Sequence, residues 1–564
     1  MIDPDRRQYL QLCLAGSALL AGCQAIDPPI GSRDGSNERI DDWQYDPPED
    51  DRIMGVTVDD VDDESIGLAA GGAADVGTFR RNVAEGYLPI PESMAYEGLF
   101  HDYYFDTGDD GSCESLFCPT YTPAIAADPL SGESDTFLSV GLDSGLTAVD
   151  FDRPPLNLVI VLDISGSMRA SFDQYYYDQF GIERRADGDT SRPKMEVATD
   201  VLVDLTHHLD PQDRLGIVLF NQDSYVAKPM RSVETTDMGA IRSHIREDVE
   251  ARGGTNISAA MADAEDLLAT VVDKDDEGNY EHRSILLTDA QTNIGETDAD
   301  ELRSSLEARA ERGFHTSVVG IGVDFNADLI NQITGVRGAN YYSVYSTDEF
   351  ERRMIDEFEF MVTPLVYDLT LEVDGDGYEI ARVYGSPAAD EATGEVMTVN
   401  TLFPSPSEDG EAKGGVVLVQ VERTGDESGD ADIELIATWE DRDGSEESVT
   451  EAVRVPAGND EHWGSEAVRK AVLLARYADL MRIWTIDERE PLEVDEADGI
   501  DSPTVRSGQW ELQSEPLVVS ERNAERIDAF ATYFETEMAA IGDDELGREL
   551  ELMDELLAAA GESP

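Results

Sequence analysis

The chain has 564 residues, 41% of them hydrophobic, and carries 121 Asp and Glu against 41 Lys and Arg, for a formal net charge of −80. The length allows roughly two to four domains, and the apolar content excludes a globally disordered chain. The charge excludes nucleic acid as a partner, because neutralising phosphates requires a basic face. Only five of the basic residues are lysine, and self-repulsion of this size is screened only at high salt, where the Debye length falls to about 3 Å at 1 M. We therefore expect a halophilic protein, with an ordinary acidic surface protein as the alternative.

Residues 1–22 have the order of an export signal: a charged start, an apolar middle and a small-residue end. Arg6 and Arg7 resemble the start of a twin-arginine signal. The uncharged stretch that follows is too short to span a bilayer as a mature helix. Leu20-Ala-Gly-Cys23 resembles a lipobox, in which Cys23 becomes the lipidated first residue. We expect twin-arginine export and a lipid anchor on the outer face of the cell membrane; the alternative is a plain cleaved signal.

Residues 23–77 are rich in Asp, Pro, Gly and Ser, which predicts a disordered acidic tether. A segment of its own is expected over 78–150, with a strand at 137–142. Cys113 and Cys118 fall in this segment, and in an oxidising exterior they would form a small-loop disulfide. Two free thiols are the alternative.

Buried strands and amphipathic helices alternate over residues 151–362, which predicts an α/β domain with a doubly wound, mostly parallel sheet. The strand at 158–162 is a continuous apolar run, typical of a parallel strand covered on both faces. The other expected strands are 215–220, 225–230, 284–288, 316–323 and 341–345. The expected helices are 194–209, 236–249, 257–272, 298–312, 327–334 and 348–361.

Past Pro364 the pattern changes to short strands between Gly and Asp turns, at 367–373, 415–421 and 433–439. We predict a β-sandwich-like module over 363–456. Residues 457–564 are expected to form C-terminal helices, of which the acidic segment 518–560 is expected to be only partly packed.

Five oxygen-bearing side chains lie just past predicted strands or in a glycine turn: Asp163, Ser165, Ser167, Thr255 and Asp289. The carboxyl ends of strands in an open α/β sheet meet at one rim, so we expect these side chains to gather there. Carboxylate and hydroxyl oxygens are hard ligands that suit Mg²⁺, with Mn²⁺ or Ca²⁺ as alternatives. The competing interpretation is that Asp163 and the serines only cap a helix and form a turn.

Asp163-Ile-Ser-Gly-Ser167, Gly254-Thr255 and Thr288-Asp289 resemble the metal-ion-dependent adhesion site of von Willebrand factor type A domains. Segments near 78–107, 293–295 and 340–348 resemble a prokaryotic secreted or lipoprotein subgroup with a pre-domain segment and a C-terminal β-rich region. The resemblance implies that Ser165, Ser167 and Thr255 bind the ion directly, and that Asp163 and Asp289 act directly or through water. Ala290 departs from the family, which usually has glycine after this aspartate.

The connection 169–193, between the metal loop and the first helix, is unusually long and rich in aromatic residues. Long loops on a ligand rim are commonly functional, so we hypothesise that it sets partner specificity, with aromatic anchors. A solvated insertion that packs on its own domain is the alternative. The candidate anchors are Phe172, Tyr175, Tyr176, Tyr177 and Phe180.

These features predict a binding protein and not an enzyme: a cell-surface lipoprotein whose metal ion bridges to an acidic side chain of a protein partner. The alternative is an accessory or sensor subunit of an envelope complex, using the same site for internal assembly. A metal-dependent hydrolase is a remote alternative, because the sequence shows neither a nucleophile elbow nor a histidine placed to serve as base.

Overall fold

The structure is a computed structural model. It describes residues 39–47, 66–70, 76–108, 113, 115–146, 151, 153–170, 174–175, 184–185, 192–272, 280–289, 299–321, 335–344, 354, 357–374, 378–385, 396–408, 411–423, 431–442, 444–456, 460–497 and 515–561. The predicted export signal with Cys23, and the loop residues Phe172, Tyr176, Tyr177 and Phe180, lie outside these residues. Within the described part of the chain, no helix is both long and apolar enough to cross a bilayer.

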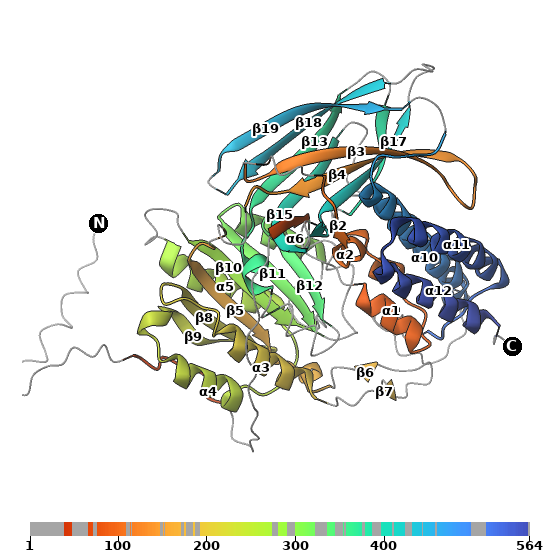
Figure 1. The fold of residues 1–564 in the computed structure, drawn as a ribbon. Coiled ribbons are helices and arrows are strands. Elements are labelled where there is room, and N and C mark those ends of the chain that lie inside the picture. The colour runs from red at the N-terminus through yellow and green to blue at the C-terminus, as the bar shows by residue number, and fades with distance from the viewer. Residues whose placement is uncertain are drawn as a thin grey trace, which may run out of the picture. The chain divides into compact units, whose positions relative to one another are not determined.

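A mostly parallel sheet forms the centre of the α/β domain, whose described elements run from β5 to α9 (Figure 1). Its described strands follow the order β12-β11-β10-β5-β8-β9, and only the edge pair β8–β9 is antiparallel. All eight positions of β5 are buried, as expected for a parallel strand covered on both faces. The strands are β5 (Leu156–Asp163), β8 (Arg214–Phe220), β9 (Ser224–Ser232), β10 (Glu281–Thr288), β11 (Phe314–Ile321) and β12 (Asn340–Val344).

Helices cover both faces of this sheet, so the doubly wound α/β prediction is confirmed. Leu158 and Ile160 of β5 face one apolar core together with α3, α4 and α9. Val159 and Val161 face the other core together with α5 and α6. The described helices are α3 (Lys194–Leu205), α4 (Met238–Asp248), α5 (Ile257–Val272), α6 (Ala299–Ala310) and α9 (Phe358–Val362).

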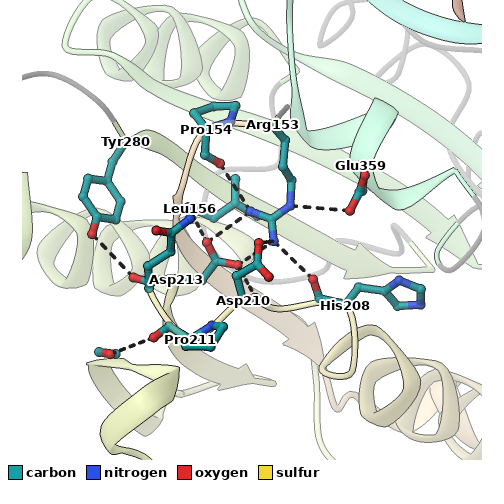
Figure 2. A network of polar contacts seen from close by, with 11 residues as sticks. Arg153, Pro154, Leu156, His208, Asp210, Pro211, Asp213, Tyr280 and Glu359 are labelled. Carbon is teal, nitrogen blue, oxygen red and sulfur yellow. Dashed lines mark hydrogen bonds and ion pairs between the residues drawn. The ribbon is translucent and has the colours of Figure 1, made fainter. Parts of the chain in front are cut away.

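A buried ion pair fastens the amino ends of β5 and β8 (Figure 2). Arg153 donates two hydrogen bonds to Asp213, of 3.1 and 2.6 Å, and both side chains are buried. Asp213 also accepts from the backbone N–H of Leu156 at 2.8 Å. From this end the parallel register of β5 and β8 runs from Asn157 opposite Arg214 to Asp163 opposite Phe220, which is the end where the candidate site lies.

Two antiparallel sheets pack face to face in the second part of the molecule, which confirms the β-sandwich. One has the order β19-β18-β13-β15-β16-β2, with β1 paired to β15, and the other has the order β14-β17-β4-β3-β20. Apolar side chains from both sheets form one core. The first sheet contains β1 (Ile66–Ala70), β2 (Tyr104–Phe105), β13 (Val366–Asp374), β15 (Val396–Glu408), β16 (Glu411–Lys413), β18 (Ala431–Asp441) and β19 (Glu446–Val455); the second contains β3 (Cys118–Ala127), β4 (Ser134–Asp143), β14 (Tyr378–Tyr384), β17 (Val416–Arg423) and β20 (His462–Trp463).

The segment 78–150 is not separate from this sandwich, contrary to the predicted boundary. Its strand β4 pairs with β17, with Val140 opposite Val417; in Figure 1 the orange β3 and β4 lie beside the cyan β17. The α/β domain is therefore inserted between strands of one sandwich. Cys118 starts β3 and forms a disulfide with Cys113, the pairing that the sequence analysis expected.

The C-terminal helices pack together with the first helices of the described chain. Their joint core contains Phe79, Phe100, Trp484, Phe530 and Met553. The segment predicted to be only partly packed therefore has a buried face, since Phe530, Phe534 and Leu556 are at most 1% exposed. These helices are α1 (Gly77–Ala84), α2 (Tyr96–His101), α10 (Glu466–Ala497), α11 (Glu521–Ile541) and α12 (Gly547–Ala560).

Residues 39–47, here called the strap, lie along the α/β domain, so the prediction of a disordered tether over 23–77 is wrong for them and for β1. Backbone hydrogen bonds join Ile40 to Thr235 and Asp237, and Gln44 to Ala227. Trp43 stacks on His244 with ring centroids 5.5 Å apart. Burial of apolar surface on Trp43 and Tyr45 favours the ordered state and offsets the conformational entropy that this otherwise acidic segment loses.

Candidate metal centre

The carboxyl ends of β5 and β10 bring the two predicted aspartates to one rim. β5 ends at Asp163, and Asp289 directly follows the last residue of β10, Thr288. The parallel register pairs Leu162 with Leu287, which places Asp163 beside Thr288. The hydroxyl of Thr288 donates to Oδ2 of Asp163 at 2.7 Å. Both aspartates are fully buried.

The loop after β5 connects the two carboxylates through its serines. The backbone N–H of Ser165 donates to Oδ1 of Asp163 at 2.7 Å. The hydroxyls of Ser165 and Ser167 are hydrogen-bonded at 2.9 Å. Ser167 Oγ donates to Oδ1 of Asp289 at 3.0 Å. Four of the five predicted residues are thus joined by one continuous chain of hydrogen bonds.

The fifth residue, Thr255, lies in a loop that is hydrogen-bonded to the serine loop. Arg252 N–H donates to the carbonyl of Ile164 at 2.6 Å, and Gly166 N–H donates to the carbonyl of Gly253 at 3.0 Å. Gly253 has a φ of +80°, which side chains other than glycine rarely adopt. Thr255 is 1% exposed and follows two residues later, so the structure brings its loop to the same rim.

The electrostatics of this rim favour a cation. Burial, with the nearby charge of Asp289 second, raises the pKa of Asp163 to about 7. Two buried carboxylates so close together repel each other, and a divalent ion would relieve both the burial cost and the repulsion. Hydroxyl and carboxylate oxygens are the donors such an ion prefers. The residues therefore fit a divalent cation.

Lys194 is the neighbour of this site that the sequence analysis did not find. It is the first residue of α3, and its Nζ lies 3.4 Å from Oδ2 of Asp289, with both side chains fully buried. Thr288 was expected as the end of a strand and as part of the Thr288-Asp289 motif, but without its contact to Asp163. The sequence did offer one signal for Lys194. It directly follows a proline at the predicted start of a buried helix, in a chain with only five lysines.

Within the predicted specificity loop, 169–193, the structure describes residues 169–170, 174–175, 184–185 and 192–193. Gln174 and Tyr175 form β6 (Gln174–Tyr175), which pairs antiparallel with β7 (Arg184–Arg185). The backbone of Tyr175 is thus in a short hairpin within the long connection. Ala290, where the family usually has glycine, lies outside the described residues.

Comparisons with known proteins identify the domain that carries this geometry. Residues 158–291, a range that contains all five oxygen residues, match the family model described as the von Willebrand factor type A domain. The chain contains a von Willebrand factor type A domain. Domains of this type commonly mediate metal-dependent protein–protein interaction.

Two curated relatives share this type A region at low identity. The human inter-alpha-trypsin inhibitor heavy chain H4 is 22% identical over 265 residues, which is 45% of this chain and 25% of that protein. The uncharacterized protein YfbK of Escherichia coli K12 is 24% identical over 315 residues, 55% of this chain and 49% of that protein. This chain thus spans about a quarter and about half of the two relatives.

Among solved structures, a von Willebrand factor type A protein from Catenulispora acidiphila aligns with a TM-score of 0.42 and 14% identity. The alignment covers 70% of this chain and 90% of that one.

Proposed function

We propose that this protein is a cell-surface binding protein whose type A domain holds a divalent cation, Mg²⁺ in the first instance, to capture an acidic side chain of a protein partner. Asp163, Ser165, Ser167, Thr255 and Asp289 would hold the ion. The ion would supply positive charge and a coordination position for the partner's carboxylate.

The observation that carries this proposal is the chain of contacts from Thr288 through Asp163, Ser165 and Ser167 to Asp289. Three of the five proposed ligands are neutral hydroxyls, so only two carboxylates would balance a bound divalent cation, and the ammonium group of Lys194 already offsets part of the charge of Asp289. Such a site favours an additional anionic ligand, and a carboxylate is the anionic group that protein partners present most often. Mn²⁺ and Ca²⁺ share this oxygen preference and remain alternatives to Mg²⁺.

A binding role fits the site better than hydrolysis. The hydroxyl of Ser165 contacts Ser167, and Ser167 donates to Asp289. A serine nucleophile would instead need a base such as histidine within hydrogen-bond reach. The relatives and the match to the type A model are compatible with a non-enzymatic role.

The proposed location rests on the amino-terminal sequence. Arg6, Arg7 and the Leu20–Cys23 motif support twin-arginine export and lipidation at Cys23, which would anchor the protein on the outer face of the cell membrane. Replacing Cys23 by serine should move the protein from the membrane fraction to the soluble fraction. Intact-mass analysis should show the lipid on the wild-type protein alone.

The connection 169–193 is the proposed specificity element beside the metal. Its two short paired strands, β6 and β7, follow Ser167 in the same connection, and the connection ends at Lys194, whose backbone N–H donates to Ala170. Deleting residues 172–190 should abolish partner capture and leave cation affinity unchanged. Unaltered capture by the deleted protein would show that the loop is only an insertion on its own domain.

The experiment that tests the proposed function has two steps in high-salt buffer. Isothermal titration with Mg²⁺ and Mn²⁺ should show one site in the wild type that Asp163→Asn removes, whereas Asp266→Asn, which neutralises an exposed carboxylate of α5, should bind normally. Capture from cell-surface extract should then depend on Mg²⁺, fail in EDTA and fail with Asp163→Asn. Recovery of the same proteins under all conditions would overturn the metal bridge. Recovery of one stoichiometric envelope complex would favour the accessory-subunit alternative.

A further inference from the structure

Lys194 is positioned by both ends of the long connection beside the metal centre. Its backbone N–H donates to the carbonyl of Ala170 at 2.9 Å, which closes the 169–193 connection onto the serine loop. Its side chain is fully buried, and Nζ lies 3.4 Å from Oδ2 of Asp289. The other oxygen of Asp289, Oδ1, accepts from Ser167. Asp289 is therefore shared between the proposed metal ligands and a fixed ammonium group.

This placement is costly for a lysine, so it needs a specific reason. Burial of an ammonium group is strongly unfavourable unless it is paired, and the first residue of a helix faces the positive end of the helix dipole. The four lysines in the described part of the chain are all at most 8% exposed, and each lies within 4 Å of a carboxylate. These pairs are Lys194–Asp289, Lys228–Asp42, Lys413–Glu357 and Lys470–Asp543.

Lys194 differs from the other three because its carboxylate belongs to the candidate metal centre. The formal charges of Asp163, Asp289 and Lys194 sum to −1 when both carboxylates are ionised. Adding a divalent cation brings the sum to +1. Without the lysine, the same loaded site would be neutral, with two carboxylates balancing the ion and three hydroxyls completing the proposed ligands.

We propose that Lys194 keeps the loaded metal site at a net positive charge, and thereby makes it bind cations more weakly and anionic partner groups more strongly. This inference rests on the proposed function and names the residue that makes an acidic partner favourable. The repulsion between the ammonium group and the ion lowers metal affinity. A carboxylate arriving from outside relieves that repulsion, so cation and carboxylate bind with positive coupling.

The test compares Mg²⁺ and Mn²⁺ dissociation constants for full-length wild type, Lys194→Met, Lys194→Arg and Lys228→Met, measured by isothermal titration in high-salt buffer after EDTA treatment and dialysis. Removing the charge at Lys194 should lower both Kd values by about tenfold, because the lost repulsion acts in a buried site where salt screens it poorly. Lys194→Arg keeps the charge and should bind like the wild type. Lys228→Met removes another buried, ion-paired lysine of the same domain and should also bind like the wild type.

A second readout uses acetate as the carboxylate probe. Acetate should strengthen Mn²⁺ binding by the wild type, and this enhancement should be lost in Lys194→Met. If Lys194→Met folds only when Mg²⁺ is present, the cation is substituting for the missing charge, which supports the proposal. If it does not fold under either condition, Lys194→Gln takes its place in the same titrations.

Three results would contradict the inference or its basis. A Kd for Lys194→Met or Lys194→Gln equal to or higher than the wild-type value would overturn the role of Lys194, as would an unchanged acetate effect. Failure of the wild type to bind Mg²⁺ or Mn²⁺ would overturn the proposed function itself.

Discussion

The hydroxyl of Thr288, the last residue of β10, donates a 2.7 Å hydrogen bond to Asp163, the last residue of β5. This contact joins the ends of two neighbouring strands and orients one carboxylate of the candidate metal centre. It also adds a hydrogen-bond donor to a fully buried carboxylate, which lowers the cost of that burial.

Replacing Thr288 by valine should destabilise the protein by about 1–3 kcal/mol, because a buried carboxylate oxygen loses its donor while the shape is kept. Mg²⁺ affinity should fall as well, since Asp163 becomes less well oriented. Chemical denaturation in EDTA and titration with Mg²⁺ measure the two effects. Thr288→Ser retains the hydroxyl and should keep the wild-type Kd; equal loss in both variants would point to the methyl group instead.

Gly253→Ala should disturb the loop that carries Thr255. A Cβ at this position would lie 2.1 Å from Oε1 of Gln222, and the φ of +80° is unfavourable for alanine by about 1–2 kcal/mol. We expect a loss of stability together with a weaker Mg²⁺ affinity. Gly313 has a similar φ of +76°, and a Cβ added there would have no neighbour within 4 Å, so Gly313→Ala isolates the backbone cost. A Kd altered equally by both substitutions would refute the role of the Gly253 loop.

Asp213→Asn should lower the free energy of unfolding by about 3 kcal/mol, because the buried Arg153 would lose its one buried carboxylate partner among the described residues and keep only exposed ones. The Mg²⁺ affinity of the folded protein should not change, because Asp213 is at the opposite end of the sheet from Asp163. Asp210 contacts the same arginine at 3.3 Å but is 58% exposed, so Asp210→Asn should cost less than about 1 kcal/mol. Denaturation curves of both variants measure the two losses of unfolding free energy. Similar losses would mean that burial of the carboxylate does not determine the strength of its ion pair with Arg153.

The lowered pKa of Glu281 predicts how the stability of the protein depends on pH. Burial opposes its ionisation, but the charges and hydrogen bonds of His315 and Arg283 outweigh burial and lower the pKa of Glu281 to about 2 from an ordinary value of 4.5. A carboxylate with a lowered pKa stabilises the fold above its unfolded pKa and loses this contribution as the pH falls through its folded pKa. The stabilisation, about 3 kcal/mol from this difference in pKa, should therefore be complete above about pH 5 and decline towards pH 2.

The check is the difference in unfolding free energy between the wild type and Glu281→Gln from pH 2 to pH 7. The two curves should be parallel at neutral pH and converge in acid. A difference that stays constant down to pH 2 would show that Glu281 acts through packing and not through its charge.

The grouping of the candidate site residues at one rim was largely predictable, because these residues are tied to local sequence patterns. The apolar run before Asp163 and the strand that ends at Thr288 fix two strand ends, and the parallel arrangement brings such ends together. Lys194 could not be placed in the same way. Its contact with Asp289 depends on how α3 packs after a long connection. The local hydrophobic periodicity of the sequence does not predict that packing.

In the β-sandwich, local sequence patterns predict a strand but not the strand with which it pairs. The alternation at 137–142 predicted a strand, and β4 confirms it, but nothing near this segment identifies β17 as its partner. The strap was missed for a different reason. Its acidic composition dominated the interpretation, although Ile40, Trp43 and Tyr45 gave an apolar signal within it.

The pairing of β4 with β17 also sets an order on biosynthesis. Val140 leaves the ribosome long before its partner Val417, and the complete α/β domain is translated between them. Until β17 has been synthesised, the edge of β4 in the hairpin β3–β4 stays unpaired. An unpaired strand edge promotes association between nascent chains. A chain that stops after α9 should therefore aggregate even though its α/β domain is complete. Rapid folding of that inserted domain would shorten the distance between the two sandwich strands before they pair.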